Sequence, residues 1–356
     1  MSLELNNGKY MKFSDWIPIN KIDWRSLSSN PNAIHILEQN LDKVYWPWLC
    51  YNPNAIHLLE KNLDKLSDVS WRWLASNQNA INIIEKNFDK LNEDGLFWGK
   101  YGVFWELLSN PSIVPFLEKN LDKMNEDYWG GLSSNPNVIP FLEKNLDKVV
   151  WWSLSYNRNA IHILEKNLDK VCWNSLSRNR NAIHILEKNL DKVNWFGLSK
   201  NPNAIHILEK NLDKVKWDNL SSNPNAIHIL EKNLDKVDWG ALSGNPNAIH
   251  IIEKNLDKVD WEGWHYLSRN PNAIPLLEKN LDKTNWEELS KNPNIFTIDY
   301  NAMKTNMYKE GGIAEELMQN RFHPRNINKF TNWGFPGFDN NDVDAEKERQ
   351  AKLLHH

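Results

Sequence analysis

Apolar and polar positions recur along this chain with a period of 22 residues. Residues 195–216 read WFGLSKNPNAIHILEKNLDKVK, and the next 22 read WDNLSSNPNAIHILEKNLDKVD. One marker asparagine per unit recurs every 22 residues, with the spacing lengthened to 25 or 33 at four points. The marker asparagines are Asn30, Asn52, Asn77, Asn110, Asn135, Asn157, Asn179, Asn201, Asn223, Asn245, Asn270 and Asn292. Self-similarity at this period predicts an array of stacked supersecondary units.

Each unit is predicted to contain two helical pieces. The longer one starts after an Asn or Ser of the type that caps helices, such as Asn32, and carries a wide apolar face that suits a helix between two neighbours. The apolar positions in the first unit are Ala33, Ile34, Ile36, Leu37, Leu41 and Val44. The shorter piece has the pattern Trp-x-x-Leu-Ser and is predicted to be one or two turns of α or 3₁₀ helix.

A unit this small cannot bury its own apolar stripe, whereas stacked units share a continuous core. We therefore predict an all-α fold, an α-solenoid of twelve two-helix repeats of about 22 residues, capped at both ends and extended as a superhelical rod or arc. The marker asparagine and a second asparagine after Glu-Lys, such as Asn40, fall where helix ends leave backbone groups without partners. Both are expected to form ladders that satisfy backbone groups between layers.

The predicted boundaries follow from the repeat. Residues 1–22 are expected to form an N-terminal cap and residues 23–299 the helical repeats. Residues 300–335 are expected to form a helical C-terminal cap. Residues 336–356 form a polar tail that ends in an apparent tag remnant, Leu-Leu-His-His.

Composition narrows the class of partner. The net charge is −4, with 42 basic and 46 acidic residues and no basic block, which argues against nucleic acid as the main ligand. The apolar runs are far shorter than the ~20 residues that span a bilayer, so no membrane association is expected and an intracellular location is favoured. The two cysteines, Cys50 and Cys172, are too far apart in the repeats to suggest a disulfide framework or a metal site.

The unit resembles the WxxLSxNPNAIxLLExNxDKI repeats found among proteins of giant DNA viruses, the mimivirus-like group, over about residues 22–335. The segment around His323-Pro324-Arg325-Asn326-Ile327 is similar to the one that closes arrays in that family. The architecture also resembles leucine-rich-variant repeats. The resemblance implies a helical-repeat fold and a viral origin, with a location in the cytoplasm of the infected cell or in the virion. It implies no defined activity.

The repeated histidines do not indicate a metal site. Equivalent residues in adjacent layers lie about a helix diameter apart, whereas zinc needs ligand atoms within ~2.0–2.3 Å of one ion. They are interpreted as solvated first-turn residues, with a pH-sensitive charged stripe as the alternative. These histidines are His35, His57, His162, His184, His206, His228 and His250.

No unit combines a nucleophile, a base and oxyanion donors, and the sequence contains no phosphate-binding glycine loop. The carboxylates exemplified by Glu38 and Asp42 alternate with lysines, as on a solvated face. We therefore predict no enzyme activity, no cofactor and no metal.

The variable positions of the short piece are the second, third and sixth residues, counted from the repeat tryptophan as the first. They are rich in aromatic residues and arginine, which is typical of a recognition surface, although exposed positions that vary without a ligand are the alternative. Two further aromatic residues come from the insertion in the third unit. The candidate partner-binding residues are Trp48, Tyr51, Trp98, Tyr101, Trp152, Tyr156, Arg178, Phe196, Lys200, Tyr266 and Arg269.

The leading functional hypothesis is a viral scaffold that binds a host or viral protein along these positions. A structural component of the virion is the alternative, and a nucleic-acid-binding helical repeat is a weaker one.

Overall fold

The computed structural model describes residues 11–93, 95–98, 102–111, 113–120 and 124–306. Two compact units divide the chain, one ending at Thr297 and the other beginning at Ile298. The predicted fold class is confirmed, because the first unit is an α-solenoid of short helices at the spacing of the repeat. Within the described residues, no helix is long and apolar enough to cross a membrane.

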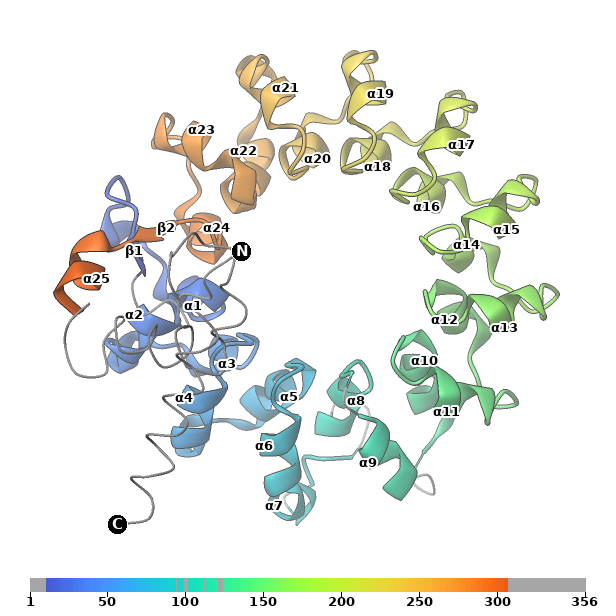
Figure 1. Ribbon diagram of the computed structural model, residues 1–356, viewed down its shortest axis with the longest axis horizontal. Helices are drawn as coiled ribbons and strands as arrows, with labels where there is room; N and C mark the ends of the chain where they lie inside the picture. The colour runs from blue at the N-terminus through green and yellow to red at the C-terminus, as the bar shows by residue number, and fades with distance from the viewer. Residues whose placement is uncertain (1–10, 94, 99–101, 112, 121–123, 307–356) are drawn as a thin grey trace, which may run out of the picture. The chain divides into compact units, whose positions relative to one another are not determined.

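Each of the first eleven repeats contributes one helix to the inner side of the array and one to its outer side, and the twelfth contributes an inner helix (Figure 1). The inner helices carry the repeat tryptophan: α1 (Trp24–Ser28), α3 (Trp46–Leu49), α5 (Asp68–Ser76), α8 (Val103–Leu107), α10 (Glu126–Ser134), α12 (Trp151–Tyr156), α14 (Trp173–Leu176), α16 (Trp195–Ser199), α18 (Trp217–Ser221), α20 (Trp239–Ser243), α22 (Trp261–Arg269) and α24 (Trp286–Lys291).

The outer helices follow the marker asparagines: α2 (Ile34–Glu38), α4 (Ile56–Lys61), α6 (Ile81–Lys86), α9 (Val114–Lys119), α11 (Ile139–Glu143), α13 (Ile161–Glu165), α15 (Ile183–Glu187), α17 (Ile205–Glu209), α19 (Ile227–Glu231), α21 (Ile249–Glu253) and α23 (Ile274–Glu278). One more helix, α7 (Phe88–Glu93), follows α6. The 3₁₀ helices are η2 (Ile19–Lys21), η3 (Pro31–Ala33), η4 (Leu41–Lys43), η5 (Leu63–Lys65), η7 (Leu256–Lys258) and η8 (Pro271–Ala273).

The outer helix is shorter than the apolar pattern predicted. In the eighth repeat α17 has five residues, as does the inner helix α16. The predicted cap position is also wrong. Asn30, not Asn32, turns the chain, because its side chain accepts a hydrogen bond from the backbone N–H of Asn32. Of the apolar residues beyond the outer helix of the first repeat, Val44 is buried, whereas Leu41 is 41% exposed.

The core repeats with the sequence. The inner-helix leucine, such as Leu198, is 0% exposed. The alanine that precedes the outer helix and the leucine of that helix, such as Ala204 and Leu208, are also 0% exposed. Val215 closes the same layer at 6%. Each of these positions is covered by the neighbouring repeat, so the layers depend on one another for stability.

The marker asparagines form the ladder that the sequence predicted. Asn223 donates from its side-chain amide to the backbone carbonyls of Ser199 and Asn201 in the preceding repeat, at 3.0 and 3.2 Å. The same pair of bonds is present at each of the twelve markers. All twelve side chains are buried, so each bond replaces water that cannot reach these carbonyls.

The second predicted ladder is wrong. Asn40 and its equivalents donate to a carbonyl of their own repeat, that of Ile36 at 2.9 Å in the first unit, and so they terminate their own helix. The second connection between layers comes instead from the asparagine two after the marker. Asn225, for example, donates to the carbonyl of Pro202 at 2.9 Å.

The ladder closes on itself, which contradicts the predicted rod or arc. Asn30 of the first repeat donates to the carbonyls of Ser290 and Asn292 in the last, at 3.0 and 2.9 Å. Asn32 donates to the carbonyl of Pro293 at 2.9 Å, and helix α1 packs against α24. Because every repeat therefore has two neighbours, the repeats within residues 11–297 form a closed ring (Figure 1).

The N-terminal segment completes the twelfth repeat. Helix η2 matches the Leu-Asp-Lys turn of the other units, and Ile22, 6% exposed, takes the position of Val44 in the first repeat. Lys21 lies 4.9 Å from the ring centroid of Trp286, as Lys258 lies 5.0 Å from that of Trp239.

A two-stranded sheet replaces the outer helix of the twelfth repeat. Strand β1 (Met11–Phe13) pairs with β2 (Phe296–Ile298), and the backbone N–H of Ser14 donates to the carbonyl of Ile295 at 3.0 Å. The rings of Phe13 and Phe296 stack with centroids 5.2 Å apart. This part of the predicted N-terminal cap therefore joins the last repeat to the first.

Beyond Thr297, the structure describes the second unit as far as Asn306. Helix α25 (Tyr300–Asn306) begins after Asp299, whose side chain accepts a hydrogen bond from the N–H of Ala302. The rest of the predicted C-terminal cap, including His323 to Ile327, and the polar tail lie outside the described residues.

Candidate functional site

The variable positions of neighbouring repeats meet on the inner helices and line two grooves. The first, which we call the aromatic groove, has a volume of about 980 Å³ and runs across α8, α10, α12 and α14. The side chains that line it include Trp105, Trp152, Tyr156, Asn174 and Arg178. All five occupy second or sixth positions, so this groove is built from the varied residues of four consecutive repeats.

Small residues keep the centre of the aromatic groove open. Gly130 and Gly131 occupy the two varied positions after Trp129 in α10. A Cβ on Gly131 would lie 2.7 Å from the Leu108 side chain, so a larger residue there would push α8 and α10 apart. Helix α10 has nine residues because of an insertion, and its added turn brings Glu126 and Asp127 to the groove.

The second groove, which we call the polar groove, has a volume of about 760 Å³ and lies on α18, α20 and α22. Its ionisable lining residues are Lys200, Asp218, Asp238, Lys258, Asp260, Glu262 and Tyr266. Asp238 and Asp260 cap helices, each accepting a backbone N–H at 2.8 Å. The Lys258 ammonium lies over the ring of Trp239. The remaining carboxylates, Asp218 and Glu262, are exposed to solvent.

The structure brings five of the eleven predicted partner-binding residues to these grooves. Trp152, Tyr156 and Arg178 line the aromatic groove, and Lys200 and Tyr266 line the polar groove. Phe196 lies between the grooves, 43% exposed, with the Arg178 guanidinium 5.7 Å from its ring centroid. Arg269 is exposed at the end of α22.

Two predicted residues, Trp48 and Tyr51, belong to the second repeat, and Trp48 lies near the junction of the first and last repeats. The Arg25 guanidinium and the Lys291 ammonium lie 5.6 and 5.2 Å from the Trp48 ring centroid. Tyr51 packs against Trp73 at 5.2 Å, and burial raises the pKa of its hydroxyl.

The remaining two predicted residues come from the insertion in the third unit. Trp98 is half-buried against Phe97 and Phe104 and donates to the Asn92 side chain at 3.1 Å, so it belongs to the packing of this insertion. Tyr101 lies outside the described residues.

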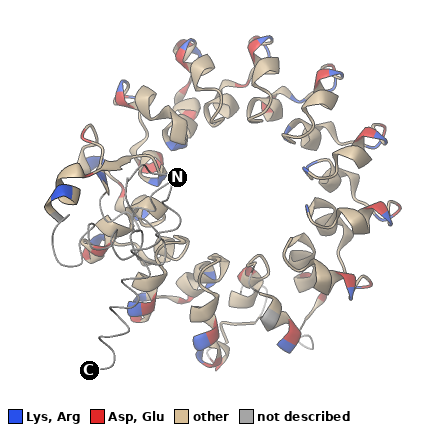
Figure 2. Cartoon of the chain, in the orientation of Figure 1, with Lys and Arg blue, Asp and Glu red and all other residues tan. Residues whose placement is uncertain are grey.

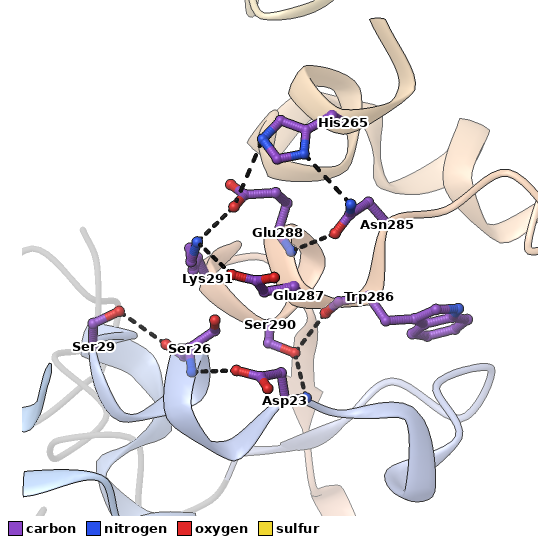
Figure 3. A network of polar contacts seen from close by, with 10 residues as sticks. All are labelled: Asp23, Ser26, Ser29, His265, Asn285, Trp286, Glu287, Glu288, Ser290 and Lys291. Carbon is purple, nitrogen blue, oxygen red and sulfur yellow. Dashed lines mark hydrogen bonds and ion pairs between the residues drawn. The ribbon is translucent and has the colours of Figure 1, made fainter. Parts of the chain in front are cut away.

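Polar contacts hold α24 to both of its neighbours (Figure 3). The buried Glu288 carboxylate lies 2.5 Å from Lys291 Nζ and 3.8 Å from His265 Nε2 of the preceding repeat. On the other side, the Ser290 hydroxyl accepts a hydrogen bond from the backbone N–H of Asp23 at 3.0 Å. The junction therefore uses the serine contact found between interior repeats, such as Ser221 with Asp238.

The groove residues that were not among the predicted binding residues include Trp105, Glu126 and Asp127. Trp105 follows Phe104, which replaces the repeat tryptophan, and so it occupies a second position in the fourth unit. The lengthened spacing before Trp129 indicates an insertion. It does not indicate that the inserted residues extend the inner helix α10. Another insertion exposes Trp261 at the start of α22, where 80% of its surface is accessible.

The side chains of six of the repeated histidines are accessible to solvent, as the sequence predicted, and each is also paired with a glutamate of the preceding repeat. His184 Nε2 lies 2.6 Å from Glu165 Oε1 of the preceding repeat, and His57, His162, His206, His228 and His250 pair in the same way. His35 is instead buried beside Phe296. Within the described residues, no group of three or more His, Cys, Asp or Glu side chains could hold a metal ion.

Charge is distributed unevenly between the two sides of the ring. Lysines and acidic residues gather on the outer loops, whereas the inner helices consist mainly of other residues (Figure 2). A ligand on the inner side would therefore meet aromatic and neutral polar side chains with a few isolated charges.

The fold and these grooves define the chain as a helical-repeat protein with its varied residues on the inner side. No family model, curated protein or solved structure matches the chain.

Proposed function

We propose that this protein is a non-enzymatic binding scaffold that holds a segment of a partner protein along the varied inner face of its ring. The observation that supports this most strongly is the aromatic groove, in which varied residues of four consecutive repeats form one surface. Trp152 and Tyr156 are 63% and 49% exposed there. Large aromatic side chains that stay in contact with water are favoured sites for a partner.

The constant part of the repeat supports the same proposal. The asparagine ladder and the buried leucines fix the backbone of every inner helix, so the varied side chains are presented on a rigid frame. A rigid surface loses little conformational entropy when it binds. Repeat proteins characteristically combine such a constant frame with varied positions on one face.

A photo-crosslinking amino acid tests this proposal. It would replace Tyr156 on the inner face in one variant and Lys166, an exposed residue after the outer helix α13, in a matched control. The expected result is a crosslink from position 156 to one protein in the lysate of the cells that make this chain, and none to that protein from position 166. Equal crosslinking at both positions would contradict the proposal.

The resemblance to repeats of giant-virus proteins suggests that these cells are infected by such a virus and that the partner is a host or viral protein. The alternative role, a structural component of the virion, would instead make the protein abundant in purified particles. Quantitative mass spectrometry of particles and of infected-cell cytoplasm distinguishes the two locations.

A further inference from the structure

We propose that the aromatic groove binds a basic segment of the partner, with a lysine or arginine side chain against Trp152 and Tyr156. This inference rests on the proposed function and assigns a chemical class to the partner. The two aromatic residues are four apart in α12 and therefore lie on the same face of the helix.

The repeat itself shows how these aromatic faces are used. The repeat tryptophan Trp151 is covered by Lys170, whose Nζ lies 5.1 Å from its ring centroid. Equivalent lysines cover eight further repeat tryptophans in the same way: Trp24, Trp129, Trp173, Trp195, Trp217, Trp239, Trp264 and Trp286.

Trp152 and Tyr156 differ from these tryptophans. Over the part of the chain that the structure describes, no lysine or arginine lies over either ring. The rings can therefore accept a cation from outside. A cation over an aromatic face is stabilised by about 0.5–2 kcal/mol, more as water is excluded.

The charges around the groove favour a basic ligand over an acidic one. Glu126 and Asp127 are exposed at one side, and neither forms an ion pair with another described residue. Among the described residues that line the groove, Arg178 is the one basic residue, and its guanidinium lies 5.7 Å from the ring centroid of Phe196. An arginine or lysine in the groove would thus meet aromatic faces and two carboxylates that lack a partner.

The volume of the groove fits a chain segment better than a single small ion. About 980 Å³ across four repeats accommodates several residues of an extended peptide. The exposed Asp218 and Glu262 of the polar groove have the same sign of charge, so a longer basic segment would be attracted at both grooves.

Fluorescence anisotropy with labelled peptides tests the inference on the full-length protein. One peptide alternates arginine with leucine, and two controls of the same length alternate glutamate or serine with leucine. The expected result is tight binding of the arginine peptide alone, weakened as salt concentration rises. Binding of all three peptides with similar affinity would overturn the inference.

Variants then locate the binding. Trp152→Ala should raise the Kd of the arginine peptide by about 2- to 30-fold, as the loss of a cation–aromatic contact requires. The double substitution Glu126→Gln with Asp127→Asn should raise the Kd and reduce its salt dependence. The controls are Trp261→Ala, an exposed tryptophan outside the aromatic groove, and Glu165→Gln on the outer side. Circular dichroism confirms that each variant is folded.

The outcomes separate the ligand class from the proposed function. A crosslink from position 156 to a protein, without preference for the arginine peptide, would overturn only the inference that the bound segment is basic. If neither the crosslink nor the preference for the arginine peptide is observed, the proposed scaffold function is overturned as well. Self-association that is lost in Trp152→Ala would identify a second copy of this chain as the occupant and would also overturn the basic segment.

Discussion

The side-chain amide of Asn30 donates a hydrogen bond to the backbone carbonyl of Asn292 at 2.9 Å, across 262 residues of sequence. The same contact joins neighbouring repeats everywhere else in the ring, 22 residues apart for Asn223 and Asn201. The last repeat therefore contacts the first as any repeat contacts the one that follows it. The hydrogen bond that closes the asparagine ladder is of the same type as those between interior repeats.

Replacing Asn30 tests closure directly. Asn30→Ala leaves the buried carbonyls of Ser290 and Asn292 without this donor, and each unsatisfied buried group costs about 1–3 kcal/mol. We expect a lower free energy of unfolding in urea and a larger radius of gyration by small-angle X-ray scattering. Asn223→Ala loses equivalent bonds between interior repeats and should lower stability without opening the ring. An unchanged radius of gyration for both variants, with Asn30→Ala as stable as wild type, would contradict the closure.

The N-terminal segment should contribute to the stability of the ring as part of its hydrophobic core. Ile22 is 6% exposed in the twelfth repeat, so Ile22→Ala should lower the free energy of unfolding by about 2–5 kcal/mol. Ile19 lies three residues earlier, in η2, but is 61% exposed, so it supplies the matched control. Ile19→Ala should change stability by less than about 0.5 kcal/mol. Urea unfolding followed by circular dichroism measures both. Similar effects of the two substitutions would show that this segment does not complete the repeat.

Acid should weaken the region around the paired strands. Burial lowers the pKa of His35 from its ordinary 6.5, although the Glu38 carboxylate acts in the opposite direction. Below pH 6.5 the unfolded chain binds a proton at this imidazole that the folded chain takes up only at a lower pH. The free energy of unfolding therefore falls as the pH decreases from 6.5 towards the pKa of the folded state, and this group has no effect above that window.

His35→Phe isolates this contribution from the other titrating groups. Phenylalanine keeps an aromatic ring beside Phe296 but cannot be protonated. Urea unfolding at pH 7.5 and pH 5.5 should show a larger loss of stability in wild type than in the variant. An equal decrease in the free energy of unfolding in both proteins would show that His35 does not cause the acid sensitivity.

The two cysteines should differ in reactivity. Cys50 is 0% exposed, and burial raises the pKa of its thiol to about 12, so it stays protonated and inaccessible in the folded protein. Cys172 is partly accessible. A thiol-reactive dye at pH 8 should label one cysteine in the native protein and two after denaturation. Rapid labelling of Cys50 in the native protein would show that the second repeat opens easily.

Varied positions can be identified from the sequence, but which of them share a groove depends on the tertiary structure. Trp152, Tyr156 and Arg178 were selected because they vary, and the structure places all three in one groove. Trp98 was selected for its aromatic character alone, and it packs inside its own insertion. Trp105 was not selected because Phe104 replaces the repeat tryptophan ahead of it, although Trp105 lies five residues before Asn110 as Trp152 does before Asn157. Glu126 lies in the insertion before Trp129, outside the varied positions.

A partial repeat near the N-terminus of the sequence also indicates that the array closes. Asn20-Lys21-Ile22-Asp23-Trp24 is closely similar to Asp235-Lys236-Val237-Asp238-Trp239, although no complete unit precedes it. The fragment is the end of a repeat without its beginning, and the last unit is a beginning without its end. Only their spatial proximity shows that the two fragments belong to the same repeat.

The sequence by itself determined the two-helix unit, the buried leucines and the marker asparagine ladder. These features depend on contacts within a unit and with its immediate neighbours, and such contacts repeat with the residues. The tertiary structure alone decided that the array closes, that Met11–Phe13 joins it at β2, and that the helices carrying the varied residues lie on the inner side. The reason is cumulative geometry: a small rotation between adjacent layers, too slight to read from any one unit, adds up over twelve repeats to a complete turn.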